Sequence, residues 1–344
     1  MLLVAASSLQ QPAVTGALSA LVLLMVLALW LALALDWRFG EPSASWHPVV
    51  WMGQYLGYLG NKITGLSPLP AFCTGALAWT AGVLAVGVMT WGLQTLVLMQ
   101  LAHTAAQPDL KSAVAAIVSV AVLAWLLKCM FSWRMLHDEV GAVEAALAQS
   151  LSAGRQRLSL LVSRDTGNLS ESEVRESAIE SLAENLNDSV VAPIFWFVLF
   201  GLPGAAIYRF ANTADAMWGY RGRWEWAGKW AAHADDVLSC LPARLTALLI
   251  WAVARNFRLD KLRPEALRTP SPNSGWPMSA MALALGVGLR KPGVYTLNAA
   301  GRPAEAADTA SAQRYASKAV FALVLLAKFA IFTIAVSLFV VLSP

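Results

Sequence analysis

Acidic side chains recur at every fourth residue in one polar stretch of the chain, residues 164–193. The stretch reads RDTGNLSESEVRESAIESLAENLNDSVVAP and turns apolar at Val190. The recurring acids are Glu176, Glu180, Glu184 and Asp188. A spacing of four places side chains on one face of a helix, where like charges repel. Two interpretations stay open: a helix face that water solvates, or a seat for Mg²⁺, which prefers oxygen ligands from one or two carboxylates.

A second polar group follows an apolar run, in the stretch YRFANTADAMWGYRGR. Here Arg209 is followed within six residues by Asn212 and Asp215. Ionisable groups at membrane depth are costly, and they are therefore functional candidates by default. Arg209 is a candidate for bidentate phosphate binding. The alternative is an arginine that snorkels to the membrane interface.

An aspartate pair stands in the stretch HADDVLSCLPAR, which also contains Arg244. Asp235 and Asp236 are candidate metal ligands. The alternative is that they cap a helix expected to begin near Val237, where negative charge favours a helix N-terminus.

Two further stretches add candidates. DWRFGEPSASWHP places Asp36, Glu41 and His47 just past the first apolar run. A lone histidine is more often a structural hydrogen-bonding residue than a ligand. SPNSGWP, which contains Ser271 and Asn273, has the composition of an ordered turn. The backbone amides of such a turn can also bind phosphate or carboxylate.

The composition shows what surrounds these side chains. Of 344 residues, 58% are hydrophobic and 13% are charged, whereas soluble domains carry about 25% charged residues. Several apolar runs are long enough to cross about 30 Å of hydrocarbon. The complete runs are residues 17–35, 71–99, 113–131 and 319–342. The net charge of +4 is too small and too scattered to indicate nucleic acid, so the expected surroundings are membrane lipid.

Two more apolar runs, residues 190–210 and 237–254, are interrupted by glycine and proline. Gly201, Pro203 and Gly204 interrupt the first, and Pro242 interrupts the second. Non-helical backbone at membrane depth survives only inside protein or beside a wet cavity. We therefore predict that both segments are broken or re-entrant.

The predicted fold is an all-α integral membrane protein, with one polytopic membrane domain over residues 1–344. It has about four full transmembrane helices, the two broken segments and cytoplasmic amphipathic helices. The polar segments are residues 36–70, 132–188, 211–236 and 255–317. Their excess of lysine and arginine predicts a cytoplasmic position, with both chain ends on the outer side.

The segment 132–188 is predicted to form two helices. Leu136, Val140, Val143 and Leu147 recur at helical spacing and indicate an amphipathic helix. After the turn RDTGN, Ser170 and Glu173 have the spacing of a capping box, which predicts a second helix over about residues 171–188.

Together these stretches resemble the adenosylcobinamide-phosphate synthase family of cobalamin biosynthesis, CbiB or CobD. The resemblance rests on DWRFGEPSASWHPVVWMG, SRDTGNLSESEVRESAIESLAENLNDSVVAPIFW, GLPGAAIYRFANTADAMWGYR, ADDVLSCLPARL and SPNSGWPMSAMALALGV, in the family's order.

This resemblance implies a ligase of the bacterial inner membrane whose active face is cytoplasmic. Its substrates are aminopropanol phosphate and adenosylcobyric acid, a corrinoid, and ATP with Mg²⁺ drives formation of the amide. Association with other enzymes of the cobalamin pathway is a further expectation.

The resemblance also suggests roles for individual residues. Metal ligands are sought among Glu180, Glu184, Asp188, Asp235 and Asp236. A general base is sought among Glu180, Glu184, Asp188 and His47. Residues expected to bind phosphate or substrate are Arg164, Arg209, Asn212, Asp215, Tyr220, Arg221, Arg244, Ser271 and Asn273. Aromatic residues such as Tyr220 and Trp276 could line a corrinoid pocket or form an interfacial belt.

The chain departs from the expected family pattern in GLRKPGVYTLNAAGRPAEAADTA, where a glycine-rich stretch is expected. The shape of the loop 286–310 is therefore left open. Two rival functions also stay open: a regulatory membrane homologue similar to AmpE, without ligase activity, and a transporter. A transporter would place ionisable groups in broken helices, often within internal repeats, and no second copy of the broken run is found.

Overall fold

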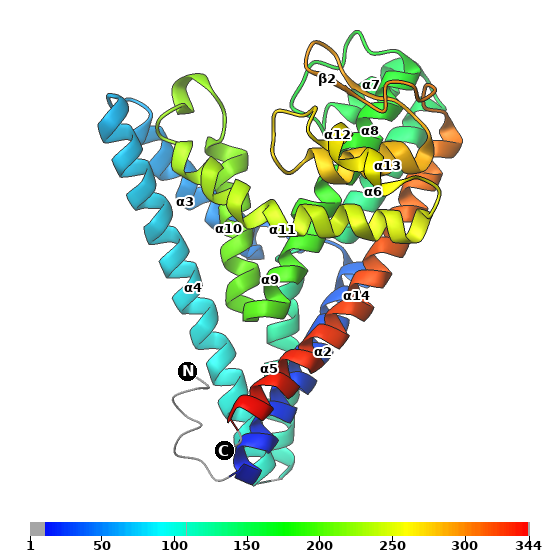
Figure 1. Ribbon diagram of the computed structural model, residues 1–344. Helices are drawn as coiled ribbons and strands as arrows, with labels where there is room; N and C mark the ends of the chain where they lie inside the picture. The colour runs from blue at the N-terminus through cyan, green and yellow to red at the C-terminus, as the bar shows by residue number, and fades with distance from the viewer. Residues whose placement is uncertain (1–10, 108, 343–344) are drawn as a thin grey trace. The chain divides into compact units, whose positions relative to one another are not determined.

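The computed structural model describes residues 11–107 and 109–342, which are mostly helical (Figure 1). The chain divides into two compact units. Unit 1 comprises Met1–Phe131, Pro193–Ala231 and Val324–Pro344, and unit 2 comprises Ser132–Ala192 and Ala232–Leu323. Each unit is described by itself. The two chain ends lie outside the described residues, so their position on the outer side stays a prediction. The single domain over residues 1–344 also stays a prediction.

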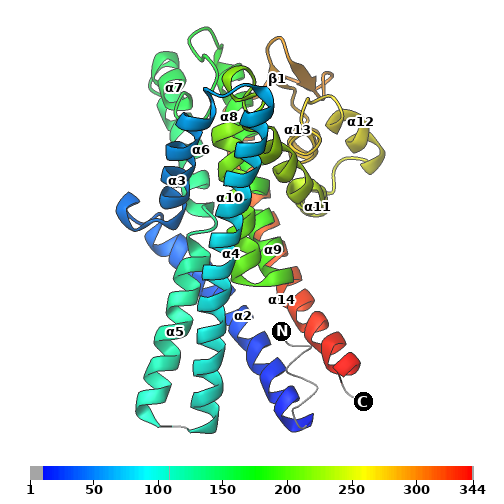
Figure 2. The ribbon, with the colours of Figure 1, turned by 90° about the vertical axis from the view of Figure 1, so that its left-hand side faces the viewer.

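Unit 1 is built from apolar helices, most of them long. They are α2 (Gln11–Phe39), α3 (Pro48–Ile63), α4 (Pro68–Ala106), α5 (Leu110–Lys128), α9 (Ala192–Phe200, whose first residue belongs to unit 2) and α10 (Leu202–Trp218). Two short 3-10 turns, η1 (Ala44–Trp46) and η3 (Gly222–Trp224), lie in the connections. Helix α2 packs on α5, and α10 packs on α4 and α3 (Figure 2).

Local signals in the sequence set where these helices begin. Helix α3 begins at Pro48, and the His47 side chain accepts a hydrogen bond from the Val49 amide. Helix α5 begins with a capping box formed by Asp109 and Ser112. Both devices satisfy amide groups that a helix N-terminus leaves without intrahelical acceptors.

The predicted interruption of the run 190–210 is confirmed at Gly201, which separates α9 from α10. Gly201 has a φ of 70°, a conformation that glycine adopts without steric cost. The Leu202 amide, at the start of α10, donates a hydrogen bond of 2.7 Å to Gln94 Oε1 on α4. A Cβ atom at position 201 would collide with the Gln94 side chain.

Unit 2 contains shorter helices and one small hairpin. The helices are α6 (Trp133–Leu147), α7 (Leu151–Leu158), α8 (Glu171–Leu186), α12 (Leu262–Ala266) and α13 (Gly275–Leu285), with a π-helical turn η2 (Asn187–Val191) and a 3-10 turn η4 (Leu259–Lys261). Strands β1 (Leu289–Lys291) and β2 (Tyr295–Leu297) pair antiparallel, with Leu289 opposite Leu297. The sequence analysis did not predict this hairpin. Helices α11 (Lys229–Ala254) and α14 (Ala306–Leu342) have residues in both units.

Both helices predicted in 132–188 are confirmed. Leu136, Val140, Val143 and Leu147 are buried along α6. Ser170 and Glu173 form the predicted capping box of α8.

The predicted interruption at Pro242 is wrong, because α11 is one continuous helix with Pro242 inside it. A proline removes one backbone donor from a helix interior. The loss is confined to one bond, and the helix continues on both sides of Pro242. In the adjacent turn, Arg244 Nη1 donates to the Cys240 carbonyl.

An all-α integral membrane protein is confirmed. Within the described residues, five helical segments are long and apolar enough to cross a membrane: Leu21–Phe39, Pro68–Thr104, Leu110–Leu147, Lys229–Ala254 and Ala306–Ser337. Four of them contain or overlap the four predicted spans, and the fifth is the continuous α11.

Candidate functional site

Helix α8 in unit 2 carries three of the four predicted acidic residues, Glu176, Glu180 and Glu184, which we call the α8 acid face. The helix packs against α6, α13 and β1. Glu176 is 0% exposed and Glu180 is 5% exposed. The interpretation of the stripe as a solvated helix face is therefore wrong for these two residues.

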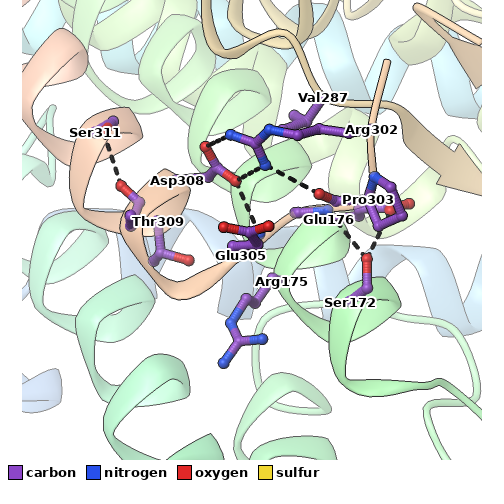
Figure 3. A network of polar contacts seen from close by, with 12 residues as sticks. Ser172, Arg175, Glu176, Val287, Arg302, Pro303, Glu305, Asp308, Thr309 and Ser311 are labelled. Atoms are coloured by element: carbon purple, nitrogen blue, oxygen red, sulfur yellow. Dashed lines mark hydrogen bonds and ion pairs between the residues drawn. The ribbon is translucent and has the colours of Figure 1, made fainter. Parts of the chain in front are cut away.

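Glu176 is held by an arginine and a serine. Arg290 Nη1, on β1, lies 2.6 Å from Glu176 Oε1, and Ser172 Oγ donates to the same oxygen at 3.0 Å. Ser172 Oγ also accepts a hydrogen bond from the Ala304 amide. Figure 3 shows how this joins the segment around Pro303 to α8, beside the Arg302–Asp308 ion pair. Burial raises the pKa of Glu176, against the opposing effects of Ser172 and Arg290.

Glu180 accepts hydrogen bonds at both of its oxygens. Tyr295 on β2 donates its hydroxyl to Oε1 at 2.8 Å, and Arg164 Nη2 donates to Oε2 at 3.3 Å. Burial raises the pKa of Tyr295, and the Glu180 charge raises it further, so Tyr295 stays a donor at neutral pH. Arg164 Nε and Nη1 are buried without an acceptor among the described residues. Arg164 therefore retains donors for one more anionic group.

Glu184 differs from its neighbours because no hydrogen bond or ion pair holds its carboxylate within the described residues. Burial, together with the charges of Asp188 and Glu180, raises its pKa to about 7 against the opposing charges of Lys291 and Arg164. A carboxyl group with this pKa is present in both protonation states near neutral pH. Such a group is suited to proton transfer.

Asp188, the fourth acid of the stripe, lies in the π-helical turn η2 rather than in α8. Asn187 Nδ2 donates to Asp188 Oδ1 at 2.7 Å, and Thr246 Oγ1 on α11 donates to Asn187 Oδ1 at 3.1 Å. Single π-helical turns inside helices are frequent at functional sites. The turn positions Asp188 at the end of the α8 acid face.

Metal binding at these carboxylates stays a prediction. No group of three His, Cys, Asp or Glu side chains that could hold a metal ion occurs in the part of the chain that the structure describes. The oxygens of Glu180 are already engaged by Arg164 and Tyr295. Asp188 is thus the better candidate for a cation that also contacts a substrate phosphate, and Glu184 stays a predicted ligand.

Arg244, Ser271 and Asn273 come together in unit 2. Arg244 Nη1 donates to Asn273 Oδ1 at 2.6 Å, and Asn273 Nδ2 donates to the Asp236 carbonyl at 2.7 Å. Ser271 Oγ accepts from the amides of Asn273 and Ser274. The SPNSGWP stretch is therefore an ordered turn, as predicted, and two of its amides already have an acceptor. The Arg244 guanidinium also lies over the Trp276 ring, 4.8 Å from its centroid.

The aspartate pair lies inside α11 and not at its beginning. Because α11 begins at Lys229, the alternative in which Asp235 and Asp236 cap a helix starting near Val237 is wrong. Asp235 Oδ2 lies 3.5 Å from Ser239 Oγ. Their role as metal ligands stays a prediction.

The remaining candidates belong to unit 1. Arg209, Asn212 and Asp215 follow each other at intervals of three residues along α10, which places them on neighbouring positions of one helix side. All three are half-buried, whereas Tyr220 and Arg221 are exposed in the loop after α10. Their role in substrate binding stays a prediction.

His47 belongs to a buried cluster that the sequence analysis only partly anticipated. Lys128 Nζ, at the end of α5, lies 2.8 Å from Glu41 Oε2 and 3.5 Å from Asp36 Oδ1. His47 Nδ1 accepts from the Val49 amide, so the proton is on Nε2, which lies 2.9 Å from Glu41 Oε2. We call these four residues the Lys128 cluster. Because both ring nitrogens are engaged, His47 has an observed structural role as the N-cap of α3.

A family model described as CobD/Cbib protein matches residues 29–328 of the chain. The chain belongs to the CobD/Cbib protein family. The resemblance found from the sequence is confirmed.

Curated relatives support this assignment to the CobD/Cbib family. The probable cobalamin biosynthesis protein CobD of Thermococcus kodakarensis is 42% identical over 266 residues, which cover 77% of this chain and 82% of the relative. The protein of the same name from Pyrococcus furiosus is 38% identical over 277 residues, covering 79% and 87%. The cobalamin biosynthesis protein CobD of Brucella suis is 38% identical over 309 residues, covering 82% and 90%. No solved structure matches the chain significantly.

Sequence reasoning missed the side chains that complement the acid face of this CobD/Cbib chain. Arg290 and Tyr295 lie in the loop 286–310, whose shape the sequence left open. Lys128, near the end of the apolar run 113–131, was not predicted as a site residue. A signal was available in both cases. A buried carboxylate requires a charged or hydrogen-bonding partner, so a predicted acidic site implies that such partners lie nearby. A lysine within an apolar run is a further sign of a buried ion pair.

Proposed function

We propose that this membrane protein acts in cobalamin biosynthesis as an ATP-dependent amide ligase, an adenosylcobinamide-phosphate synthase. It joins the amine of aminopropanol phosphate to the free propionate of adenosylcobyric acid, and the product is adenosylcobinamide phosphate. Membership of the CobD/Cbib family supports the pathway. The observation that carries the chemistry is Glu184, a carboxyl group without an ion-pair partner and with a pKa of about 7.

The reaction imposes two demands on the site. A carboxylate is a poor electrophile, so its oxygen first takes the terminal phosphoryl group of ATP, and ADP leaves. The amine nitrogen then attacks the acyl carbon, phosphate leaves and the amide forms. The amine must lose a proton to react, and all substrates are anionic. The site therefore needs a base of suitable pKa and positive charge near the phosphates.

Glu184 is our candidate for the base. An alkylammonium group is protonated at neutral pH, and a base with a pKa near the working pH is the most effective acceptor of its proton. Glu180, being fixed by Tyr295 and Arg164, orients the face and contributes to the raised pKa of Glu184. Arg164, with two buried donors unused, is our candidate for contact with a phosphate.

We place Mg²⁺, as a proposal, at the end of the α8 acid face. The mutual repulsion of Glu184 and Asp188 is the sign of a place where a cation is favourable. Mg²⁺ is commonly held by one or two carboxylates together with substrate phosphates. Asp188 is the proposed protein ligand, and the bound ion would supply positive charge to phosphate oxygens. This leaves Glu184 free to accept a proton.

We also propose that the active face lies on the cytoplasmic side of a bacterial-type inner membrane, where ATP is available. Ten lysine and arginine residues between Arg255 and Lys318 support that orientation through the positive-inside rule. The polar side chains of Arg209, Arg221 and Arg244 are proposed to contact substrate.

The test uses the purified chain in detergent, incubated with adenosylcobyric acid, aminopropanol phosphate, ATP and Mg²⁺. The mass of the corrinoid product is measured for the wild type, Glu184→Gln and Glu171→Gln. Glu171 is the matched control, because it is an exposed carboxylate at the start of the same helix.

We expect product from the wild type and from Glu171→Gln, and a loss of at least a hundredfold in rate for Glu184→Gln, the lower end of what general base catalysis contributes. Equal rates for all three proteins would remove Glu184 from the chemistry. Absence of product with the wild type, while the corrinoid still binds, would favour the regulatory, AmpE-like alternative.

A further inference from the structure

Unit 2 also contains a cavity lined by polar residues. None of the predicted site residues lines it. The cavity has a volume of about 560 Å³ and follows directly on the last turn of α11. Its lining is formed by the segment 255–258 with Lys261, the end of α13 with Gly286, and the stretch from Asn298 to Gly301. A volume of this size is typical of small-molecule sites.

The charge of this cavity is positive. Arg255, Arg258 and Lys261 line it, and no carboxylate does. Two acids lie nearby, and both are engaged: Asp260 pairs with Arg258 at 2.7 Å, and Glu265 accepts from the Asn298 amide and pairs with Arg268. Two cations therefore remain for a ligand, Arg255 and Lys261. Within the described residues Lys261 has no side-chain partner, and Arg255 donates only its Nε, to the Ala252 carbonyl.

The backbone conformation is a second, independent observation. Arg255 and Asn298 have positive φ values of 54° and 47°, and they are the non-glycine residues with positive φ among the described residues. Both line this cavity. Asparagine tolerates this conformation, but an arginine after the end of a helix stands where glycine is usual. Backbone strain of this kind clusters at ligand sites, where the side chain is needed.

We propose that this cavity binds a phosphate-bearing anion, with Arg255 and Lys261 as its charged contacts. A guanidinium group matches phosphate geometry bidentately, and an ammonium group acts as a point charge beside it. The phosphate has two sources with the same chemistry, a soluble polyphosphate or the headgroup of an anionic lipid at the end of a candidate span. The inference does not rest on the proposed ligase function.

The experiment measures binding to the full-length protein in a neutral detergent. Sodium pyrophosphate is titrated by calorimetry, and retention of phosphatidylglycerol is measured by native mass spectrometry. The variant is Arg255→Asn with Lys261→Gln, in which asparagine preserves the positive φ of position 255. The matched control is Arg263→Gln, which removes an exposed cation of the same segment that does not line the cavity.

We expect the double variant to bind at least tenfold more weakly than the wild type, with the control within about twofold and all thermal midpoints unchanged. Loss of pyrophosphate binding identifies a soluble ligand, and loss of phosphatidylglycerol retention alone identifies a lipid headgroup. Arg255→Lys keeps the charge but loses the bidentate contact, so its affinity should lie between those of the wild type and the double variant. Equal binding by wild type and double variant, or no binding of either probe to the wild type, would overturn the proposal.

Discussion

The Lys128 cluster of unit 1 and the α8 acid face of unit 2 are both buried groups of acidic side chains, but their charges are compensated differently. In the Lys128 cluster the lysine contacts both carboxylates, and His47 contacts Glu41. On α8, Glu176 and Glu180 have arginine partners, whereas Glu184 has none among the described residues. Each carboxylate of the Lys128 cluster contacts the lysine, which favours a structural role. An incompletely compensated carboxylate is costly for stability and is suited to proton transfer.

The largest effect is expected where this pairing is broken in the Lys128 cluster. Lys128→Met leaves Asp36 and Glu41 without their cation in a buried environment, and we expect a loss of about 3–5 kcal/mol in the free energy of unfolding. Thermal unfolding in detergent measures the loss. Adding Asp36→Asn and Glu41→Gln to the variant should restore most of the stability. An unchanged midpoint for Lys128→Met would show that the cluster is not structural.

The second prediction concerns the pH dependence of stability at Glu184. Its pKa in the folded chain is about 7, and in the unfolded chain it is near the ordinary value of 4.5. Between these pH values the folded chain keeps a proton that the unfolded chain has lost, so stability falls as pH rises through this window. Allowing for solvent screening, the loss is about 2 kcal/mol.

Glu184→Gln removes this dependence. The variant should be about as stable as the wild type at pH 5 and more stable than it at pH 8. Chemical denaturation at the two pH values measures the difference. A wild type that is stabilised between pH 5 and pH 8 relative to the variant would contradict the assigned pKa.

The third prediction changes the charge around Glu184 while leaving Glu184 itself in place. Glu180→Gln removes a like charge that raises the pKa of Glu184, and it also frees Arg164. The pKa of Glu184 should then fall by about one unit, which corresponds to 1.4 kcal/mol. The acidic limb of the pH–rate profile reports the shift. Lys291→Gln should move the same limb to higher pH, and shifts of both variants in one direction would refute the electrostatic explanation.

The smallest effect is expected at His47. Asparagine is a good helix N-cap, so His47→Asn should keep the start of α3 and cost less than about 1 kcal/mol, while His47→Ala loses the cap and costs about 1 kcal/mol. Both variants should retain ligase activity. A fully folded His47→Asn protein without activity would instead support the predicted role of His47 as a base.

The sequence was sufficient where a feature depends on local chemistry. The capping box at Ser170, the buried face of α6 and the interruption at Gly201 follow from residue types and spacing, and all are observed. Pro242 shows the limit of that reasoning. A proline predicts a break from local rules, but it removes only one backbone donor, and α11 continues through it.

The site was predictable as a set of acids but not as an electrostatic arrangement. The spacing of Glu176, Glu180 and Glu184 indicates one helix face. The spacing does not reveal that arginines pair with Glu176 and Glu180, whereas Glu184 has no partner among the described residues. The partners are Arg290 for Glu176, and Arg164 and Tyr295 for Glu180. Tyr295 lies more than a hundred residues after Glu180 in the sequence. Such pairings depend on tertiary packing, which a single sequence does not reveal.

The hydrogen bond between Gln94 and Leu202 has a consequence for how the protein is made. Its two residues are 108 positions apart, with the acceptor earlier in the chain. During synthesis α4 therefore leaves the ribosome well before α10, and the glutamine is already present when the first amide of α10 needs an acceptor. The acceptor of this contact is therefore synthesised before its donor. A circular permutation that placed α10 ahead of α4 would reverse this order, so that the donor is synthesised before its acceptor.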